Sequence, residues 1–323
     1  MIRTWVKQFR LQRMFFKEII RFWQLTTKYN ASSHTDEDIQ KMQYTLLREN
    51  HTIEKGLSMR EPRRGFGQQK VAELMIRLNK YIDLYWDRDP AFLDYPLSTI
   101  KAYIDYTHES GINISHHENE YNKLLERTGK LGVEKHAGIT EMTKKEVCQL
   151  CNKDFETLLY SRHSIRYFTD EMISEEILKK ALTLAQQTPS ACNRQGWLTH
   201  IFIGNSSIDL IKWQGGCRGF ESEIRNSILV TANLKAFLSY EIHQAYVDGG
   251  LYAMNLINAL HSLGLGTIPL SCAFDCDKLK LLSQFNIPEY EVPIVIIGIG
   301  HLYEKFNVAV SERKEISKTN TFH

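Results

Sequence analysis

The chain has 323 residues, of which 43% are hydrophobic, enough to build one large domain or two ordinary ones around a buried core. Its 40 basic residues nearly balance its 38 acidic residues, and a net charge of +2 gives no overall attraction to nucleic acid or membranes. We therefore expect a globular protein with no nucleic-acid partner. A charged binding surface, if there is one, must come from a local cluster of like charges.

The first 30 residues carry such a local signal, with seven basic residues against one acidic residue, Glu18. Trp5, Phe9, Phe16 and Trp23 fall between these charges at roughly helical intervals. A basic, aromatic helix can lie on an anionic membrane surface, or it can pack its apolar stripe against the rest of the protein. We favour packing against protein.

From Thr35 to about Cys151 the sequence predicts helices and almost no strands. Thr35 and Asp38 form a plausible capping pair before a periodic apolar run, and turn-prone pairs separate the later helical stretches. The later helices are expected at Val71–Trp86, Leu97–His108 and His117–Arg127.

The second half alternates short β-rich runs with helices, which favours an α/β or α+β domain. We expect strands at Thr199–Ile203, Ser227–Ala232 and Pro293–Ile299, and helices at Ser174–Gln187 and His243–Leu263. The predicted organisation is an all-helical N-terminal extension at residues 1–150, followed by a second domain at residues 151–323.

The six cysteines follow no secretory signal peptide, so we expect reduced thiols and a cytoplasmic location. Cys148/Cys151 and Cys272/Cys276 could together supply four zinc ligands, but the two pairs lie far apart in the chain. We expect no metal site. No apolar run is long enough to span a bilayer.

The most informative stretch is residues 161–168, which read Ser-Arg-His-Ser-Ile-Arg-Tyr-Phe. Arg162 and Arg166 could hold a dianionic phosphate with charge-assisted hydrogen bonds, and Ser164 could donate another. By themselves, three polar residues at this spacing are more typical of an ordinary solvated surface.

A second motif follows one helix later, where residues 188–197 read Thr-Pro-Ser-Ala-Cys-Asn-Arg-Gln-Gly-Trp and lead into a predicted strand. The two motifs, in this order and at this separation, resemble the nitroreductase family of FMN oxidoreductases. Gly196 stands where that family usually has proline.

The resemblance implies an α+β fold, with a central, mostly antiparallel sheet flanked by helices. It also implies a homodimer that binds FMN at the subunit interface, where Asn193 and the C-terminal tail could reach across to the partner. The first motif would hold the phosphate and ribityl chain, and Asn193 would bind the flavin ring. The implied cofactor-binding residues of the two motifs are Arg162, His163, Ser164, Arg166, Pro189, Ser190, Asn193 and Gln195.

Two further segments fit the same family order. Residues 263–271 resemble the loop whose backbone faces flavin N5, which would add Pro269, Leu270 and Ser271 to the site. In the family this loop commonly carries an acidic residue and glycine, where this chain has Ser271-Cys272-Ala273. Cys272 could be redox-active, although a small buried thiol is the more ordinary role. Arg313 would supply a further cation for the phosphate.

The resemblance implies an oxidoreductase that passes reducing equivalents from NAD(P)H, a transient visitor, through FMN to a nitroaromatic, quinone or similar acceptor by a ping-pong mechanism. The flavin carries the chemistry, so no catalytic side chain is assigned. The alternatives are a dehydrogenase or dehalogenase of the same fold acting on a specialised metabolite, or a non-enzymatic membrane-surface protein. The chain has neither a dinucleotide-binding glycine motif nor a P-loop.

In the N-terminal extension, residues 51–67 form the densest polar and glycine-bearing stretch. His51, Glu54 and Lys55 would share a helical face. This stretch could form a lid over the flavin, but a helix end with an ordinary surface ion pair is the simpler interpretation.

Overall fold

The computed structural model describes residues 5, 8–10, 12–17, 19–20, 23, 35–129, 137–237, 241, 243–274 and 276–323. The chain divides into two compact units, which are described separately. Met1–Arg21 together with Met142–Phe306 form the sheet unit, and Phe22–Glu141 together with Asn307–His323 form the helical unit. The division expected near residue 150 stays a prediction, and these contacts place the end of the chain with the helices.

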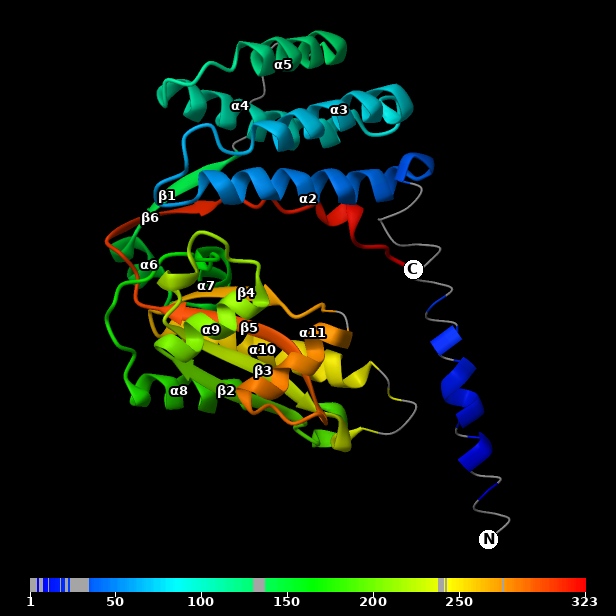
Figure 1. Cartoon of the computed structure of the whole chain (residues 1–323), viewed down its shortest axis with the longest axis vertical. Helices are drawn as coiled ribbons and strands as arrows, with labels where there is room; N and C mark the ends of the chain where they lie inside the picture. The colour runs from blue at the N-terminus through cyan, green and yellow to red at the C-terminus, as the bar shows by residue number, and fades with distance from the viewer. Residues whose placement is uncertain are drawn as a thin grey trace. The chain divides into compact units, whose positions relative to one another are not determined.

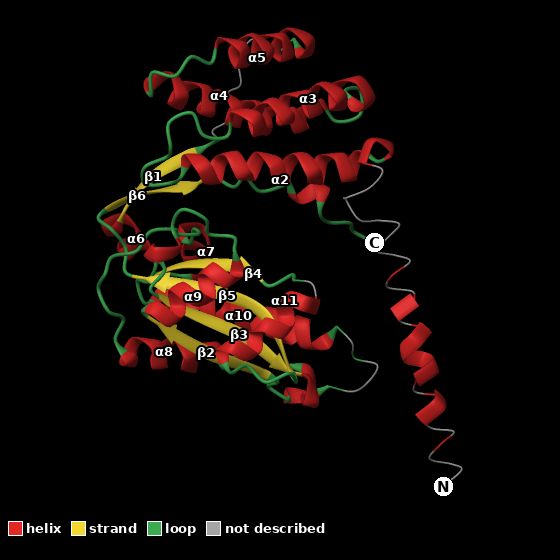
Figure 2. Cartoon of the chain, in the orientation of Figure 1, coloured by secondary structure: helices red, strands yellow, loops and turns green. Residues whose placement is uncertain are grey.

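The sheet unit is built on four antiparallel strands in the order β2-β3-β5-β4 (Figure 2). The strands are β2 (Trp197–Ile203), β3 (Asn226–Asn233), β4 (Gly266–Ser271) and β5 (Glu291–Gly300). The helices are α6 (Lys144–Leu150), α7 (Phe155–Ser161), α8 (Glu175–Ala185), α9 (Asn205–Gln214), α10 (Gln244–Ser262) and α11 (Cys276–Lys280).

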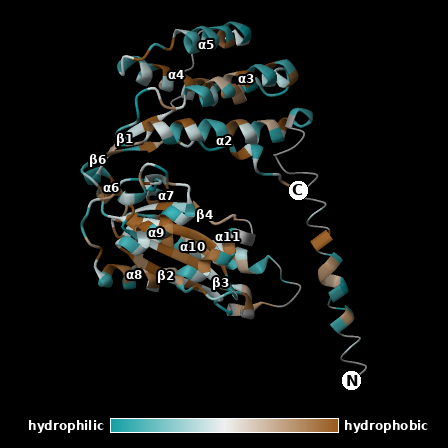
Figure 3. Ribbon diagram, in the orientation of Figure 1, coloured by the Kyte–Doolittle hydropathy of each residue, from teal (hydrophilic) through white to brown (hydrophobic). Residues whose placement is uncertain are grey.

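Alternation along β3 sets the two faces of this sheet. Ile228 and Val230 pack in one apolar core with α8 and α10, and Trp197 stacks on Tyr252 of α10 at 4.8 Å. Ser227 points to the other face, where its hydroxyl accepts a hydrogen bond from Ser207 of α9 at 2.8 Å. Helices therefore cover both faces, and Figure 3 shows the strands between them coloured as largely hydrophobic.

The helical unit contains four long helices around a second apolar core (Figure 1). These are α2 (Ile39–Leu57), α3 (Gln68–Tyr85), α4 (Asp94–Glu109) and α5 (Ser115–Thr128). Asp38 caps α2 by accepting a hydrogen bond from the Lys41 backbone at 3.2 Å, and the expected pairing of Thr35 with Asp38 stays a prediction.

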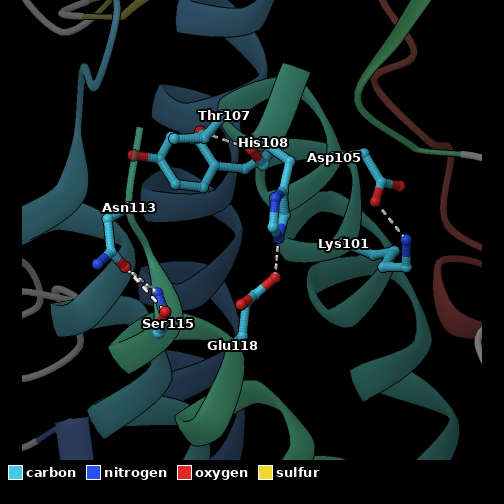
Figure 4. A network of polar contacts seen from close by, with 8 residues as sticks. Lys101, Asp105, Thr107, His108, Asn113, Ser115 and Glu118 are labelled. Carbon is cyan, nitrogen blue, oxygen red and sulfur yellow. Dashed lines mark hydrogen bonds and ion pairs between the residues drawn. The ribbon is translucent and has the colours of Figure 1, made fainter. Parts of the chain in front are cut away.

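Local polar contacts fix the turn from α4 to α5 (Figure 4). The Asn113 side chain accepts hydrogen bonds from the backbone and hydroxyl of Ser115, which starts α5. His108 near the end of α4 contacts Glu118 of α5. The short polar connection thereby joins the two helices.

Two short strands, β1 (Ile139–Thr143) and β6 (Lys305–Ala309), pair with each other where the chain passes between the units. The expectation that the N-terminal region holds almost no strand is wrong at β1. Its sequence, Ile-Thr-Glu-Met-Thr, is short and only weakly alternating, and its partner lies more than 160 residues away in the chain. Local pattern alone therefore gave no signal.

The predicted α+β class is confirmed, with helices ahead of an antiparallel sheet that is itself flanked by helices. The predicted helices and the strands β2, β3 and β5 all form, with ends shifted by a few residues. Among the described residues, no helix is both long and apolar enough to cross a membrane.

The expectation that the N-terminal aromatic residues pack against protein stays a prediction. The described residues between positions 5 and 23 are all helical. Trp5, Phe9, Phe16 and Trp23 are 73%, 66%, 66% and 64% exposed. The basic positions Arg3, Lys7, Arg21 and Lys28 lie outside the described residues.

Candidate flavin site

The first motif leaves the end of α7 and attaches to an edge strand of the sheet. Asp154 caps α7 through the Thr157 backbone at 3.0 Å, and Ser161 ends the helix. Ser164 then forms a parallel bridge with Thr267 of β4, and the Ile165 backbone donates to the Thr267 carbonyl at 2.9 Å. The residues between Arg162 and Arg166 are thus held on β4 by backbone pairing.

A buried contact anchors the start of this motif. The Ser161 hydroxyl hydrogen-bonds His261 Nε2, near the end of α10, at 2.9 Å. Burial is the largest cause that lowers the pKa of His261 to about 4, and the neighbouring Arg162 and His163 contribute to the same shift. His261 is therefore neutral at physiological pH.

Arg166, the second arginine of the motif, could also contribute to a phosphate site. Arg166 is only 6% exposed, and buried charges interact strongly because little water screens them. The Thr267 hydroxyl, on the strand position that pairs with Ser164, is buried without a hydrogen-bond partner among the described residues. A guanidinium and a hydroxyl are the kinds of donor that could hold the phosphate of FMN.

Contacts to the start of α10 shape the second motif. The Asp248 carboxylate accepts a hydrogen bond from the Ala191 backbone at 3.2 Å, and the Ser190 hydroxyl accepts one from the Gln195 backbone at 2.9 Å. Cys192 and Gln195 adopt positive φ angles of 51° and 48°. Such backbone strain persists where surrounding contacts fix the loop.

A bidentate ion pair adds a second constraint, because Arg194 contacts both Glu241 carboxylate oxygens at 2.7 and 2.8 Å. Gly196 occupies the position where the resembled family has proline. A Cβ there would meet the Phe237 ring at 2.9 Å. The departure from the motif is therefore matched by Phe237, which fills the space that a larger residue would need.

The segment that resembles the N5 loop is a strand for most of its length, and the expectation of a loop from residue 263 is corrected to β4 (Gly266–Ser271). Pro269 is tolerated because β4 is an edge strand, where a missing N–H costs no ladder bond. Leu270 is buried and Pro269 is exposed. The Gln214 side chain donates to the Ser271 carbonyl at 2.9 Å, which fixes the end of the strand.

Cys272 follows as a buried thiol. Burial raises its pKa to about 12, so the thiol stays protonated at neutral pH. This supports the ordinary role of a small apolar side chain over a reactive thiolate. Among the described residues, no group of three or more His, Cys, Asp or Glu side chains could hold a metal ion.

The two motifs lie at opposite edges of the sheet within one chain. The first motif pairs with β4, and Ser271 is the last residue of that strand. The second motif leads into β2. Three strand spacings of about 4.8 Å separate these edges, or about 14 Å. One chain therefore does not bring all of the predicted residues together. Asn193 lies on the short helical turn Ala191–Asn193 at the β2 side.

Arg313 lies in the tail that belongs to the helical unit. Its guanidinium donates to the Ser311 carbonyl at 2.6 Å. The tail contacts the helices through the Glu312 backbone, which donates to the Tyr95 hydroxyl at 3.3 Å, and through Lys318, which contacts Asp89 at 2.9 Å. The phosphate role of Arg313 stays a prediction.

The polar stretch at residues 51–67 turns Glu54 into the core of the helical unit. Glu54 is fully buried, and its carboxylate accepts hydrogen bonds from the Tyr95 hydroxyl at 2.6 Å and the Gly138 backbone at 3.2 Å. The expectation of an ordinary surface ion pair is wrong for Glu54. The Phe66 ring packs on Gly56, 2.1 Å from where a Cβ would stand.

Sequence reasoning missed His261, Asp248 and Glu241, which hold the two motifs in place. His261 and Asp248 sit on the buried side of α10, and Glu241 lies just before that helix. Each acts on a segment at least 47 residues away in the chain. A buried Asp in an apolar helix was the one available signal, because such a charge is rarely buried without a partner.

The arrangement is that of an α+β domain whose antiparallel sheet carries a cationic, phosphate-compatible motif on one edge. Residues 159–301 match the family model described as "Nitroreductase family". This part of the chain is a nitroreductase-family domain. The helical unit lies outside the matched residues.

Named relatives agree with this match. A protein of Archaeoglobus fulgidus named "Putative NADH dehydrogenase/NAD(P)H nitroreductase" is 29% identical over 148 residues, which are 45% of this chain and 83% of that protein. A protein of the same name from Methanothermobacter thermautotrophicus is 24% identical over 144 residues, covering 44% of this chain and 73% of that one.

Among solved structures, a "putative nitroreductase in complex with FMN" from Exiguobacterium sibiricum is similar at 19% identity, with a TM-score of 0.45. The match covers 53% of this chain and 98% of that chain.

Proposed function

We propose that this chain is an FMN-dependent oxidoreductase that takes reducing equivalents from NAD(P)H and passes them to an oxidised small molecule such as a nitroaromatic or a quinone. The observation that carries the proposal is the attachment of the first motif to β4. It places Ser164 beside Thr267 at one end of the strand and leaves Ser271 at the other. Four residues of strand span about 13 Å.

The first motif and the end of β4 serve two roles, phosphate binding and contact with the flavin ring. Arg162, Ser164 and Arg166 bind the phosphate, with His163 beside them and Arg313 as a further cation. Bound FMN would supply hydride acceptance at N5 and electron transfer to the acceptor. Backbone groups near Ser271 would lie at N5 of the bound flavin, where a donor favours the charge of the reduced ring. The Gln214 contact to the Ser271 carbonyl keeps those groups in position.

We propose that the second motif serves the flavin of a partner copy, so the protein acts as a homodimer. Within one chain this motif lies at the far edge of the sheet from β4. Pro189, Ser190, Asn193 and Gln195 then complete the partner's site, with Asn193 binding the flavin ring. The apolar side chains of α10 that point away from its buried side offer the contact surface. They are Tyr246, Val247, Leu251 and Met254.

A complementation experiment tests the function and its shared site together. One copy carries Arg162→Ala and Arg166→Ala, and the other carries Asn193→Ala; each homodimer should bind FMN poorly. In a heterodimer isolated by two different tags, one of the two sites keeps both intact motifs. We expect about half of the wild-type flavin content and flavin bleaching by NAD(P)H.

The outcomes separate the parts of the proposal. Wild-type protein that binds no FMN would refute the function itself. Flavin binding by the wild type, without recovery in the heterodimer, would place the whole site within one chain and refute the shared site. A matched heterodimer that carries all three substitutions in one copy controls for exchange of subunits, because both of its sites lack one motif.

A further inference from the structure

The N-terminal segment places its described apolar and basic side chains on separate faces of a helix. At about 100° per residue, six exposed apolar residues fall within an arc of about 140°. These residues are Trp5, Phe9, Phe15, Phe16, Ile19 and Ile20. The exposed basic residues Arg10, Arg13 and Lys17 occupy the next 60° or so of the helix surface.

No charged residue of the first 23 falls within the apolar arc when the same spacing is applied to the sequence. Gln8 and Gln12 are the uncharged polar residues inside it. The result is a wide apolar face, rich in aromatic residues, beside a face that is almost purely cationic.

We propose that this helix binds in the plane of an anionic membrane surface, with its aromatic residues in the headgroup region and its basic residues at the phosphates. Phe and Trp side chains favour that region, and Lys and Arg are attracted to anionic lipid. A second copy of the chain is a poorer partner. Its helix also carries seven basic residues and one acidic residue, so the two positively charged helices would repel each other.

The width of the apolar face also favours a lipid surface. A helix that pairs with another helix uses a narrower stripe, and its flanking positions usually carry charges of both signs. Here the described charges beside the apolar face are all positive. The membrane inference is independent of the proposed flavin chemistry, since it uses none of the residues of that site.

Vesicle flotation of the purified full-length protein tests the inference. We expect binding to phosphatidylcholine vesicles that contain about a third phosphatidylglycerol, and little binding to phosphatidylcholine alone. Binding should weaken as salt rises above about 0.1 M, because the Debye length then falls below about 10 Å. Tryptophan fluorescence should be quenched by brominated lipid in the anionic vesicles.

Two sets of charge variants separate the helix from overall charge. Arg10→Glu, Arg13→Glu and Lys17→Glu together should reduce partitioning to anionic vesicles by roughly 100-fold, at about fivefold for each basic residue removed. The control combines Lys101→Glu, Lys123→Glu and Lys179→Glu, which changes the net charge equally at exposed positions elsewhere. It should keep nearly wild-type partitioning.

A variant that lacks the apolar face tests whether this face contacts protein instead of lipid. Trp5→Ser, Phe9→Ser and Phe16→Ser should abolish vesicle binding and leave the sedimentation mass unchanged. A change in mass with no change in vesicle binding would show that the apolar face contacts protein and overturn the proposal. Absence of wild-type binding to anionic vesicles, or equal losses in both charge variants, would also overturn it.

Discussion

The sheet unit and the helical unit each contain one dense polar motif, and the two motifs use their polar groups in different ways. Ser164 and Ile165 pair with β4 through their backbones, and the two arginines of the motif flank them in the sequence. Residues 51–67 turn Glu54 inward, where Tyr95 and Gly138 donate to it. Motif density alone therefore does not mark a binding site; what each charged group contacts does.

The largest expected effect tests the cationic motif of the sheet unit. Replacing Arg162 and Arg166 with Ala removes two charged donors, each worth about 1.5–3 kcal/mol to a bound phosphate. FMN affinity should fall at least about 100-fold, which titration of the flavin-free protein would measure. Arg218→Ala with Arg225→Ala, at surface positions of the same unit, is the control and should retain flavin. A double variant that purifies with full flavin would refute the phosphate assignment.

In the helical unit, Glu54→Ala should reduce stability without acting on flavin. The substitution leaves the Tyr95 hydroxyl and the Gly138 N–H without their acceptor, and each buried unsatisfied group costs about 1–3 kcal/mol. We expect a loss of about 3 kcal/mol in denaturant unfolding. Glu73→Ala, which removes the same charge at an exposed position of α3, should change stability by less than about 0.5 kcal/mol. Equal effects of the two substitutions would show that the Glu54 contacts are unimportant.

Gly56→Ala tests whether close packing with Phe66 explains the glycine of this motif. An added Cβ would overlap the ring, so we expect a loss of about 2 kcal/mol. In a Phe66→Ala background the space is open, and the same substitution should be neutral or slightly stabilising, because Ala is the better helix former. The double-mutant cycle in denaturant measures this change of sign. An equal cost in both backgrounds would assign the glycine another cause.

The smallest effect concerns the His261 contact beneath the cationic motif. Its folded pKa of about 4 lies below the ordinary value of 6.5, so only the unfolded chain gains a proton as the pH falls between them. Stability should therefore fall with pH through this window, by about 1 kcal/mol between pH 7 and pH 5.5. His261→Asn should flatten that part of the pH profile of unfolding. An unchanged profile would mean that His261 titrates normally.

Much of the fold could be predicted, because period and capping are local. Ser174 caps α8 as expected, by accepting a hydrogen bond from the Ile177 backbone at 3.3 Å, and the apolar runs of β3 and β5 form the centre of the sheet. β1 and most of β4 escaped prediction. β1 depends on a partner strand that is distant in the chain. β4 contains Gly266 and Pro269, and in sequence these residue types indicate a loop.

The site divides in the same way. The order and spacing of the two motifs are properties of the sequence, and they sufficed to indicate the family and the residue types that suit a phosphate. The tertiary structure decided which groups meet. It paired Ser164 with β4 and placed the second motif at the opposite edge of the sheet. It also brought His261 to Ser161 and Asp248 to the Ala191 backbone through hydrogen bonds. Those pairings join residues that are distant in the chain, and their energy comes from burial and hydrogen bonding that no local pattern encodes.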